Sequence, residues 1–252
     1  MVPANDGRCA LSPALHPESA RLSEWSQSAV RRAFDVFLVL AILPALLPLC
    51  LLVAITVRCS SQGPILFLQQ RVGRRGSRFT ILKFRTMRVP LGPRRSSIAT
   101  LHHPEITRIG RVLRLWKLDE LPQFINVLRG DMSLIGPRPR VPEQQVDTLC
   151  CRPGITGPAA LLFAQEELLL ATLPAHTIEE YCRTVLLPIK HQLDACYMAR
   201  ATPLSDLRLL VRTALRRWPR QHPPLPATPH EALRPLESVL ESILEPRFGS
   251  PL

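Results

Sequence analysis

Two adjacent carboxylates, Asp119 and Glu120, lie in the stretch from Leu113 to Arg140, which reads LRLWKLDELPQFINVLRGDMSLIGPRPR. Pro122 and Gly130 predict a helix that begins near Asp119 and ends at Gly130, because proline is tolerated in a first turn and glycine in a C-cap. A helix N-terminus stabilises both an ionised carboxylate and an arriving phosphate. Asp119 is therefore a candidate nucleophile and Glu120 a candidate ligand of a divalent cation. The alternative is that Asp119 only caps this helix and Glu120 only favours its first turn.

A predicted β-hairpin upstream carries two candidate phosphate ligands. Apolar runs at 64–69 and 79–84 flank a basic turn with glycine, which indicates two short strands joined by a loop. Lys83 and Arg85 alternate where the second strand ends, so they share a face and could meet a diphosphate. The alternative is a solvated strand edge.

Three further candidates lie in a helix and two loops. Arg114 is the last of three arginines spaced three apart in a basic amphipathic helix predicted at 106–115, which could lie on a membrane surface or merely present a solvated basic face. Arg138 is presented by the proline-stiffened sequence GPRPR. Thr156, in the glycine-bearing turn RPGITG, could bind a nucleotide or phosphate together with backbone N–H groups.

The segment from Val36 to Val57 has 22 residues without a charge, which is long enough to cross a bilayer as a straight helix. Pro44 and Pro48 interrupt its hydrogen bonding and favour a bend. Arginines flank both ends, so the charge asymmetry that orients a crossing helix is missing, and a helix that dips in and returns fits better. A single-pass anchor stays open, whereas about 30 preceding residues argue against a cleaved signal. Asp35, at the border, is expected to pair with an arginine.

Composition favours a small membrane-associated protein. The 252 residues carry a net charge of +12, with 29 Arg against 3 Lys, and arginine grips phosphates and anionic headgroups. Nucleic-acid binding is disfavoured, because aromatic residues make up only 5% and no recognition motif is present. The seven cysteines include no C-x-x-C pair, so they indicate neither a zinc site nor a disulfide framework and suit a reducing compartment.

Several motifs resemble, in the same order, those of the bacterial sugar transferases, the monotopic polyprenyl-phosphate phosphoglycosyl transferases. The resemblance covers about 31–217. Its motifs are RRAFDVFLVLAILPALLPL from Arg31, QGPILFLQQRVGRRGSRFTILKFRTM (62–87), ITRIGRVLR (106–114), LDELPQFINVLRGDMSLIGPRPR (118–140), RPGITG (152–157), and the spaced residues Tyr181, Pro188, Lys190, Tyr197, Asp206 and Thr213. Many relatives continue RPGITG with Trp-x-Gln, where this chain has Pro158-Ala159-Ala160.

This resemblance implies that Asp119 attacks the β-phosphate of a UDP-sugar, releases UMP and passes the sugar phosphate to polyprenyl (undecaprenyl) phosphate, the initiating step of exopolysaccharide, O-antigen or glycoconjugate synthesis. It also implies Mg²⁺ held partly by Glu120, with Arg85, Arg114 and Arg138 neutralising charge. The membrane helix would be re-entrant with its break at Pro48, and the protein monotopic in the bacterial inner membrane, with its catalytic domain on the cytoplasmic face.

The expected fold is α+β and mainly helical, with a re-entrant membrane helix, a small catalytic domain, a β-hairpin and surface amphipathic helices. Helices are also expected at 178–187, 189–201 and 204–218. A homodimer is conceivable. Two other functions stay open: a non-catalytic basic membrane scaffold, and a soluble-nucleotide hydrolase. The expected regions are a disordered N-terminus (1–30), the membrane helix (31–58), the catalytic domain (59–218) and a proline-rich extension (219–252).

Overall fold

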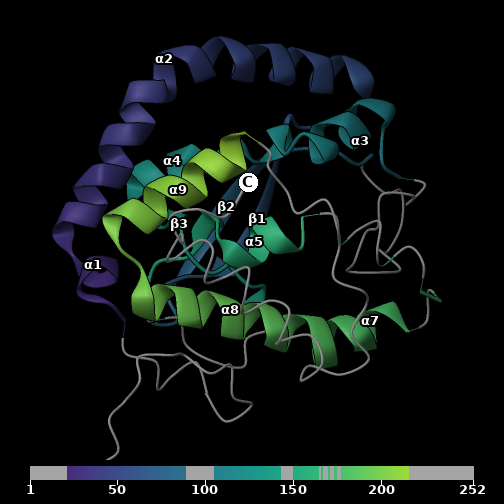
Figure 1. The fold of residues 1–252 in the computed structure, drawn as a ribbon. Coiled ribbons are helices and arrows are strands. Elements are labelled where there is room, and N and C mark those ends of the chain that lie inside the picture. Colours follow the sequence, from purple (N-terminus) through teal and green to yellow (C-terminus); the bar gives the residue numbers. More distant parts are fainter. Residues whose placement is uncertain are drawn as a thin grey trace, which may run out of the picture.

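The computed structural model describes residues 22–88, 105–142, 150–164, 166, 170, 173–174 and 177–215. The loop expected at 89–104, most of the N-terminal region and the C-terminal extension lie outside these residues. The described part is mostly helical with two small two-stranded sheets (Figure 1), so the expectation of a mainly helical α+β fold is confirmed.

A single helix, α2 (Ala29–Ser60), contains the whole apolar segment, and by length and composition it could cross a membrane. Pro44 and Pro48 lie inside it without ending it. The helix is nevertheless bent: one part stands along the side of the molecule and the rest runs across the top (Figure 1). Prolines are the usual cause of such bends, because each removes a hydrogen bond and crowds the preceding turn. The predicted break is therefore a bend within a continuous helix.

The two parts of α2 pack against different apolar clusters. Val39 belongs to the main core, whereas Val53 and Val57 join Phe84 and Leu113 in a second, smaller cluster. The opposite surface of the helix stays uncovered, with several large apolar side chains about half exposed or more: Phe37, Leu47, Leu51, Leu52 and Ile55. An apolar surface of this kind is what a helix in contact with lipid presents.

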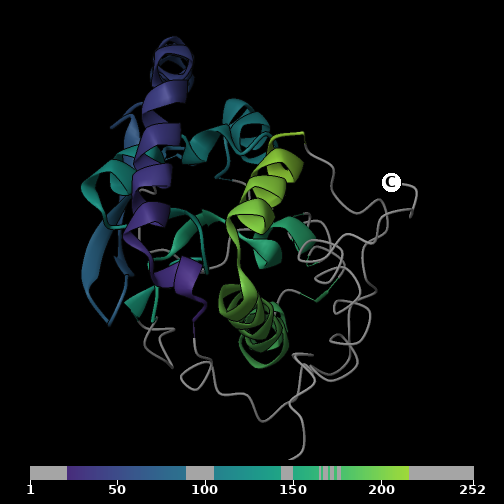
Figure 2. The same cartoon turned by 60° about the vertical axis from the view of Figure 1, so that its left-hand side comes forward.

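The predicted hairpin is confirmed as β1 (Leu66–Val72) and β2 (Arg78–Phe84), an antiparallel pair in which Leu66 lies opposite Phe84. Seen in Figure 2, β1 and β2 lie on one side of α2 and the C-terminal helix α9 on the other. A second, parallel pair was not predicted: β3 (Ser133–Ile135) and β4 (Gly154–Thr156). These strands have three residues each, which is too short for a periodic signal in the sequence.

Besides residues of α2, β2 and β3, the main core is formed largely by helices from the second half of the chain. These are α5 (Pro158–Leu162), α7 (Ile178–Tyr181), the π-helical turn η3 (Cys182–Leu186), α8 (Leu187–Arg200) and α9 (Pro203–Ala214). Residues 178–200 are helical without a break, so the interruption expected at Pro188 is only a change from the π-helical turn η3 to α8, which begins at Leu187. Ile189, Leu193, Tyr197 and Leu209 are fully buried.

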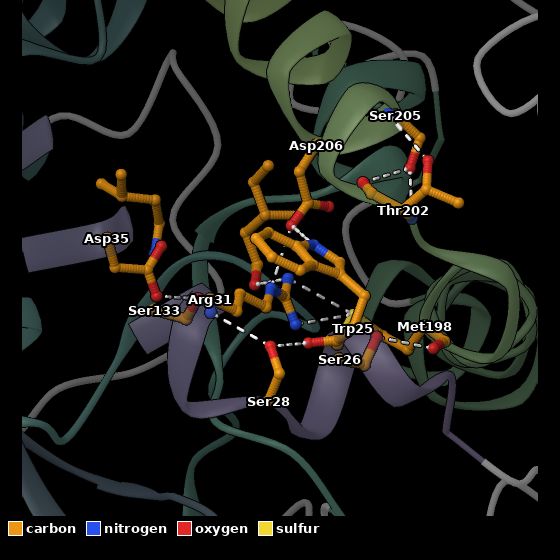
Figure 3. A network of polar contacts seen from close by, with 12 residues as sticks. Trp25, Ser26, Ser28, Arg31, Asp35, Ser133, Met198, Thr202, Ser205 and Asp206 are labelled. Atoms are coloured by element: carbon orange, nitrogen blue, oxygen red, sulfur yellow. Dashed lines mark hydrogen bonds and ion pairs between the residues drawn. The ribbon is translucent and has the colours of Figure 1, made fainter. Parts of the chain in front are cut away.

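A buried ion pair joins α2 to α9. Arg31 Nε donates to Asp206 Oδ2 at 2.9 Å, and Arg31 Nη2 donates to the carbonyl of Ile135 in β3 at 2.9 Å. Asp206 also accepts a hydrogen bond from Trp25 Nε1 at 2.8 Å (Figure 3). The Tyr197 hydroxyl donates a further hydrogen bond to Asp206 at 2.7 Å. Trp25 lies in the short helix α1 (Glu24–Gln27), within the region expected to be disordered. The network therefore fixes the start of α2 to α9 and β3.

Asp35 does not have the hydrogen-bond partners expected of it. It accepts hydrogen bonds from the Ser133 hydroxyl at 2.7 Å and from the Leu134 N–H at 3.3 Å, while Arg31 pairs with Asp206 (Figure 3). The expected pairing of Asp35 with an arginine is found only as an electrostatic interaction with the nearby charge of Arg31, because β3 supplies the hydrogen-bond donors of this carboxylate. Asp35 thus holds α2 onto β3.

Asp206→Ala should strongly destabilise the protein. The substitution leaves Arg31, Trp25 and Tyr197 without their shared acceptor, and removing one partner of a buried ion pair typically costs about 3–5 kcal/mol. Chemical denaturation in detergent would measure the free energy of unfolding, with Glu179→Ala at an exposed site of α7 as the control. A loss no larger than that of the control would show that the network contributes little.

Candidate active site

The acidic pair lies in a tight turn between two helices. Asp119 and Glu120 belong to the 3-10 helix η1 (Leu118–Glu120), and α4 (Gln123–Arg129) starts only after Pro122. The expectation that Asp119 caps this helix is therefore wrong, since the 3-10 helix precedes α4 along the chain and Pro122 is the N-cap residue of α4. The helix does end at Gly130, whose φ of 90° is readily adopted only by glycine.

Glu120 is the acceptor on which two basic groups converge. Its Oε1 lies 2.8 Å from Lys83 Nζ, at the end of β2, and 2.7 Å from Arg138 Nη2, in the loop after β3. Burial alone would raise the pKa of Glu120, but the charges of Arg138 and Lys83 outweigh it and hold the pKa well below its usual range. Burial lowers the pKa of Lys83. Residues from three separate elements thus form one charged cluster.

Asp119 is as buried as Glu120 but differently surrounded. Its Oδ1 is inaccessible to solvent and has no hydrogen-bond partner among the described residues. Burial, and secondly the negative charge of Glu120, raise the pKa of Asp119 to about 6, although Lys83, Lys117 and Arg114 act in the opposite direction. An unpartnered carboxylate oxygen beside a cationic cluster is well placed to attack an electrophile.

Arg114 and Arg85 each donate hydrogen bonds to a group outside the acidic pair. Arg114, in α3 (Arg108–Leu115), donates from Nε to the Thr86 hydroxyl at 3.0 Å, and its charge reaches Asp119. Arg85 donates from Nη2 to the carbonyl and hydroxyl oxygens of Ser61, at 2.7 and 3.0 Å. Lys83 and Arg85 were expected to meet one ligand together, but the structure gives them different partners.

Thr156 is further removed from the acidic pair. It pairs with Ile135 across the β3–β4 ladder, and its hydroxyl lies 3.1 Å from the hydroxyl of Thr213 in α9. The structure therefore gives it a neighbour in α9 and no recorded contact with Asp119 or Glu120. Its expected role in nucleotide or phosphate binding remains a prediction.

Two charged groups lie near the Arg138 loop: Asp194, which the sequence analysis missed, and Lys190, which it named only as a motif residue. Asp194 in α8 is buried and accepts the Ala159 N–H at 3.2 Å, and burial raises its pKa to about 7. Lys190, one turn earlier, pairs with Glu166 and lies 5.6 Å from the ring centre of Phe163. The signal for Asp194 was present, since a carboxylate between Leu193 and Cys196 interrupts an apolar face.

The expected Mg²⁺ can be compared with the side chains that could bind a metal ion. The described ranges contain no group of three or more His, Cys, Asp or Glu residues that could hold an ion. Mg²⁺ needs less, because it commonly binds one or two carboxylates and completes its shell with water and substrate phosphates. Glu120, whose carboxylate neighbours that of Asp119 in η1, can contribute to such a partial site and leaves Oδ1 of Asp119 available as a nucleophile.

Comparison with known sequences agrees with this geometry. The family model described as bacterial sugar transferase matches residues 26–218, a range that contains every predicted site residue. The chain belongs to the bacterial sugar transferase family. The resemblance seen in the sequence motifs is thereby confirmed.

Several relatives have names that state an activity. The chain is 38% identical over 184 residues to the undecaprenyl-phosphate glucose phosphotransferase of Komagataeibacter xylinus, covering 68% of this chain and 33% of the relative. It is 41% identical over 138 residues to the UDP-glucose:undecaprenyl-phosphate glucose-1-phosphate transferase of Caulobacter vibrioides, covering 50% and 51%. It is 38% identical over 151 residues to the exopolysaccharide production protein ExoY of Sinorhizobium fredii, covering 50% and 66%. The chain thus spans between a third and two thirds of these relatives.

Proposed function

We propose that this family member is a phosphoglycosyl transferase that moves a sugar 1-phosphate from a UDP-sugar to polyprenyl phosphate and releases UMP. The acceptor named in the relatives is undecaprenyl phosphate, and ExoY serves exopolysaccharide production. The proposed reaction would initiate synthesis of a lipid-linked surface glycan. The observation that carries the proposal is the buried, unpartnered Oδ1 of Asp119 beside the Glu120–Lys83–Arg138 cluster.

In the first half-reaction, Oδ1 of Asp119 attacks the β-phosphorus of the donor. The bond between this phosphorus and the oxygen that bridges to the α-phosphate breaks, and UMP leaves with the electron pair. Lys83 and Arg138 neutralise charge on the diphosphate, which is a large contribution in a buried site. Glu120 holds these two cations in place. Because the intermediate is covalent, the soluble donor and the lipid acceptor react with the enzyme one after the other.

In the second half-reaction, the phosphate of the lipid attacks the phosphosugar on Asp119 and the carboxylate is regenerated. Glu120 would partly hold Mg²⁺, which would supply further charge neutralisation on phosphate oxygens. Arg114 would contribute positive charge from the other side of Asp119.

The bent helix α2 suits a monotopic arrangement. Its uncovered apolar side chains would enter the bilayer, while arginines at both ends would stay at one surface. We accordingly place the protein in the bacterial inner membrane, with α2 re-entrant and the catalytic domain on the cytoplasmic face. Cysteine labelling at the start and end of α2 would test this: accessibility from the same side supports re-entry, and from opposite sides a crossing helix.

The rate of the first half-reaction should fall in acid with an apparent pKa near 6. Burial and the charge of Glu120 raise the pKa of Asp119 to about 6, and only the ionised carboxylate attacks. The rate therefore rises with pH through this value and levels off above it. A pH series of UMP release without lipid would measure the profile. An acid limb near pH 4, the ordinary range of an aspartate, would contradict a raised pKa.

UMP release from a panel of UDP-sugars would test the function directly. The protein would be held in nanodiscs, with and without undecaprenyl phosphate. Turnover that requires the lipid, with one preferred sugar, supports the proposal. Continuous UMP release without lipid would instead indicate a nucleotide hydrolase. No release with any sugar from folded, membrane-bound protein would favour a scaffold.

A further inference from the structure

Arg85 has hydrogen-bonding capacity that the described protein does not use. Its side chain is 7% exposed, and only Nη2 has acceptors, both on Ser61. Nε and Nη1 are buried and have no hydrogen-bond partner among the residues placed by the structure. The N–H groups of a buried guanidinium normally all donate hydrogen bonds. Two N–H groups without an acceptor therefore point to an anion that binds there.

The position of Arg85 indicates which anion this is. Ser61 is the C-cap of α2, so Arg85 lies where the apolar helix ends. The preceding residue, Phe84, packs with Val53 and Val57 of this helix in the second apolar cluster. Leu51, Leu52 and Ile55 are exposed on the same part of α2. A ligand at Arg85 therefore has an apolar surface beside it.

A second arginine connects this position to the nucleophile. Arg114 Nε donates to the hydroxyl of Thr86, the residue next to Arg85, and the charge of Arg114 reaches Asp119. Lys83 and Arg138 are bound to Glu120, and Lys117 also acts on Asp119 through its charge. Arg114 therefore links Asp119, through its charge, to the segment that contains Arg85.

We propose that Arg85, with Arg114 beside it, binds the phosphate of the lipid acceptor, and that Lys83 and Arg138 bind the diphosphate of the donor. The ligand class is an isoprenoid monophosphate, whose dianionic head suits a guanidinium fork and whose tail suits the exposed apolar residues of α2. This inference rests on the proposed transferase function. It divides the basic residues, which the sequence grouped together, into two subsites.

The division assigns the second chemical step. An oxygen of the lipid phosphate, held at Arg85, attacks the phosphorus bound to Asp119. A new phosphoanhydride bond forms, the bond between phosphorus and the Asp119 oxygen breaks, and its electron pair returns to the carboxylate. No proton or further reactant is needed, because the attacking phosphate is already ionised.

The test compares the two half-reactions in Arg85→Gln. Exchange of labelled UMP into the UDP-sugar, without lipid, reports the first, and the KM for undecaprenyl phosphate reports acceptor binding. Loss of a charged contact to phosphate should raise this KM about tenfold or more, while exchange falls less than about threefold. Arg88→Gln removes an equal charge from an exposed position three residues away and should change neither value. Arg85→Lys keeps the charge without the fork and should give an intermediate KM.

Equal loss of both half-reactions in Arg85→Gln, with an unchanged melting temperature, would overturn the inference, and so would an unchanged KM for the lipid. If Arg85→Gln does not fold because Ser61 loses its hydrogen-bond donor, UMP exchange and the KM for undecaprenyl phosphate are compared in Arg85→Lys instead, and the same outcomes apply. Wild-type protein that shows neither exchange nor lipid product would instead contradict the proposed function, so the two failures are distinguishable.

Discussion

Asp119→Asn should abolish UMP release, with and without undecaprenyl phosphate. Asparagine has almost the same shape, but its amide oxygen is a poor nucleophile and carries no charge. Removal of a covalent nucleophile in other enzymes lowers kcat by about 10⁴-fold or more, and a similar loss is expected here. The burst of UMP that precedes steady turnover should disappear as well. Rapid-quench measurement of labelled UMP would detect both effects.

Asp131→Asn is a suitable control for this substitution. Asp131 lies just after α4 and accepts a hydrogen bond from Asn126 Nδ2 at 3.2 Å, which an asparagine oxygen can also accept. UMP release by this variant should stay close to that of the wild type. A burst that survives in Asp119→Asn would mean that another group is the nucleophile.

Glu120→Gln should lower the rate of UMP release by about 10²- to 10³-fold, the range observed when one electrostatic element of an active site is removed. Glutamine cannot balance the charges of Lys83 and Arg138, which lie 2.8 and 2.7 Å from Oε1. The two cations are then free to move away from the donor diphosphate. Rapid-quench kinetics of the variant would measure the loss.

The same variant has a second effect that separates this account from a simple loss of structure. The charge of Glu120 raises the pKa of Asp119, so removing this charge should lower that pKa below about 6. The acid limb of the residual rate should therefore move to lower pH. Glu180→Gln, at an exposed position of α7, should change neither the rate nor the limb. An unmoved limb in Glu120→Gln would show that the titrating group is not Asp119.

The sequence predicted those features that depend on local chemistry. The end of α4 at Gly130 follows from the left-handed conformation that glycine tolerates, and the hairpin follows from two apolar runs around a glycine-bearing turn. The start of α4 was less predictable. The sequence from Leu118 to Pro122 is compatible with an α-helix capped by Asp119 and with a 3-10 turn. Packing of the buried acidic pair selects the 3-10 turn.

Long-range partners could not be predicted from the residues alone. Arg31 and Asp206 are 175 positions apart, and pairing Arg31 with Asp35 was equally consistent with the sequence. Lys83 and Arg85 have different partners for a similar reason. Lys83 lies at the end of β2 and Arg85 just after it, but their partners come from η1 and from the C-cap of α2. The role expected of Asp119 came from the family resemblance, whereas its burial and unpartnered oxygen came from the structure.

The central claim is that Asp119 carries the sugar phosphate between two half-reactions, and peptide mass spectrometry of the quenched protein tests it most directly. The protein would be incubated with its preferred UDP-sugar without any lipid, quenched in acid and digested. The account predicts release of about one UMP per active site and a mass gain of one phosphosugar on the peptide that contains Asp119. UMP release that occurs only when lipid is present, with no modified peptide, would contradict it and indicate a direct transfer between the two substrates.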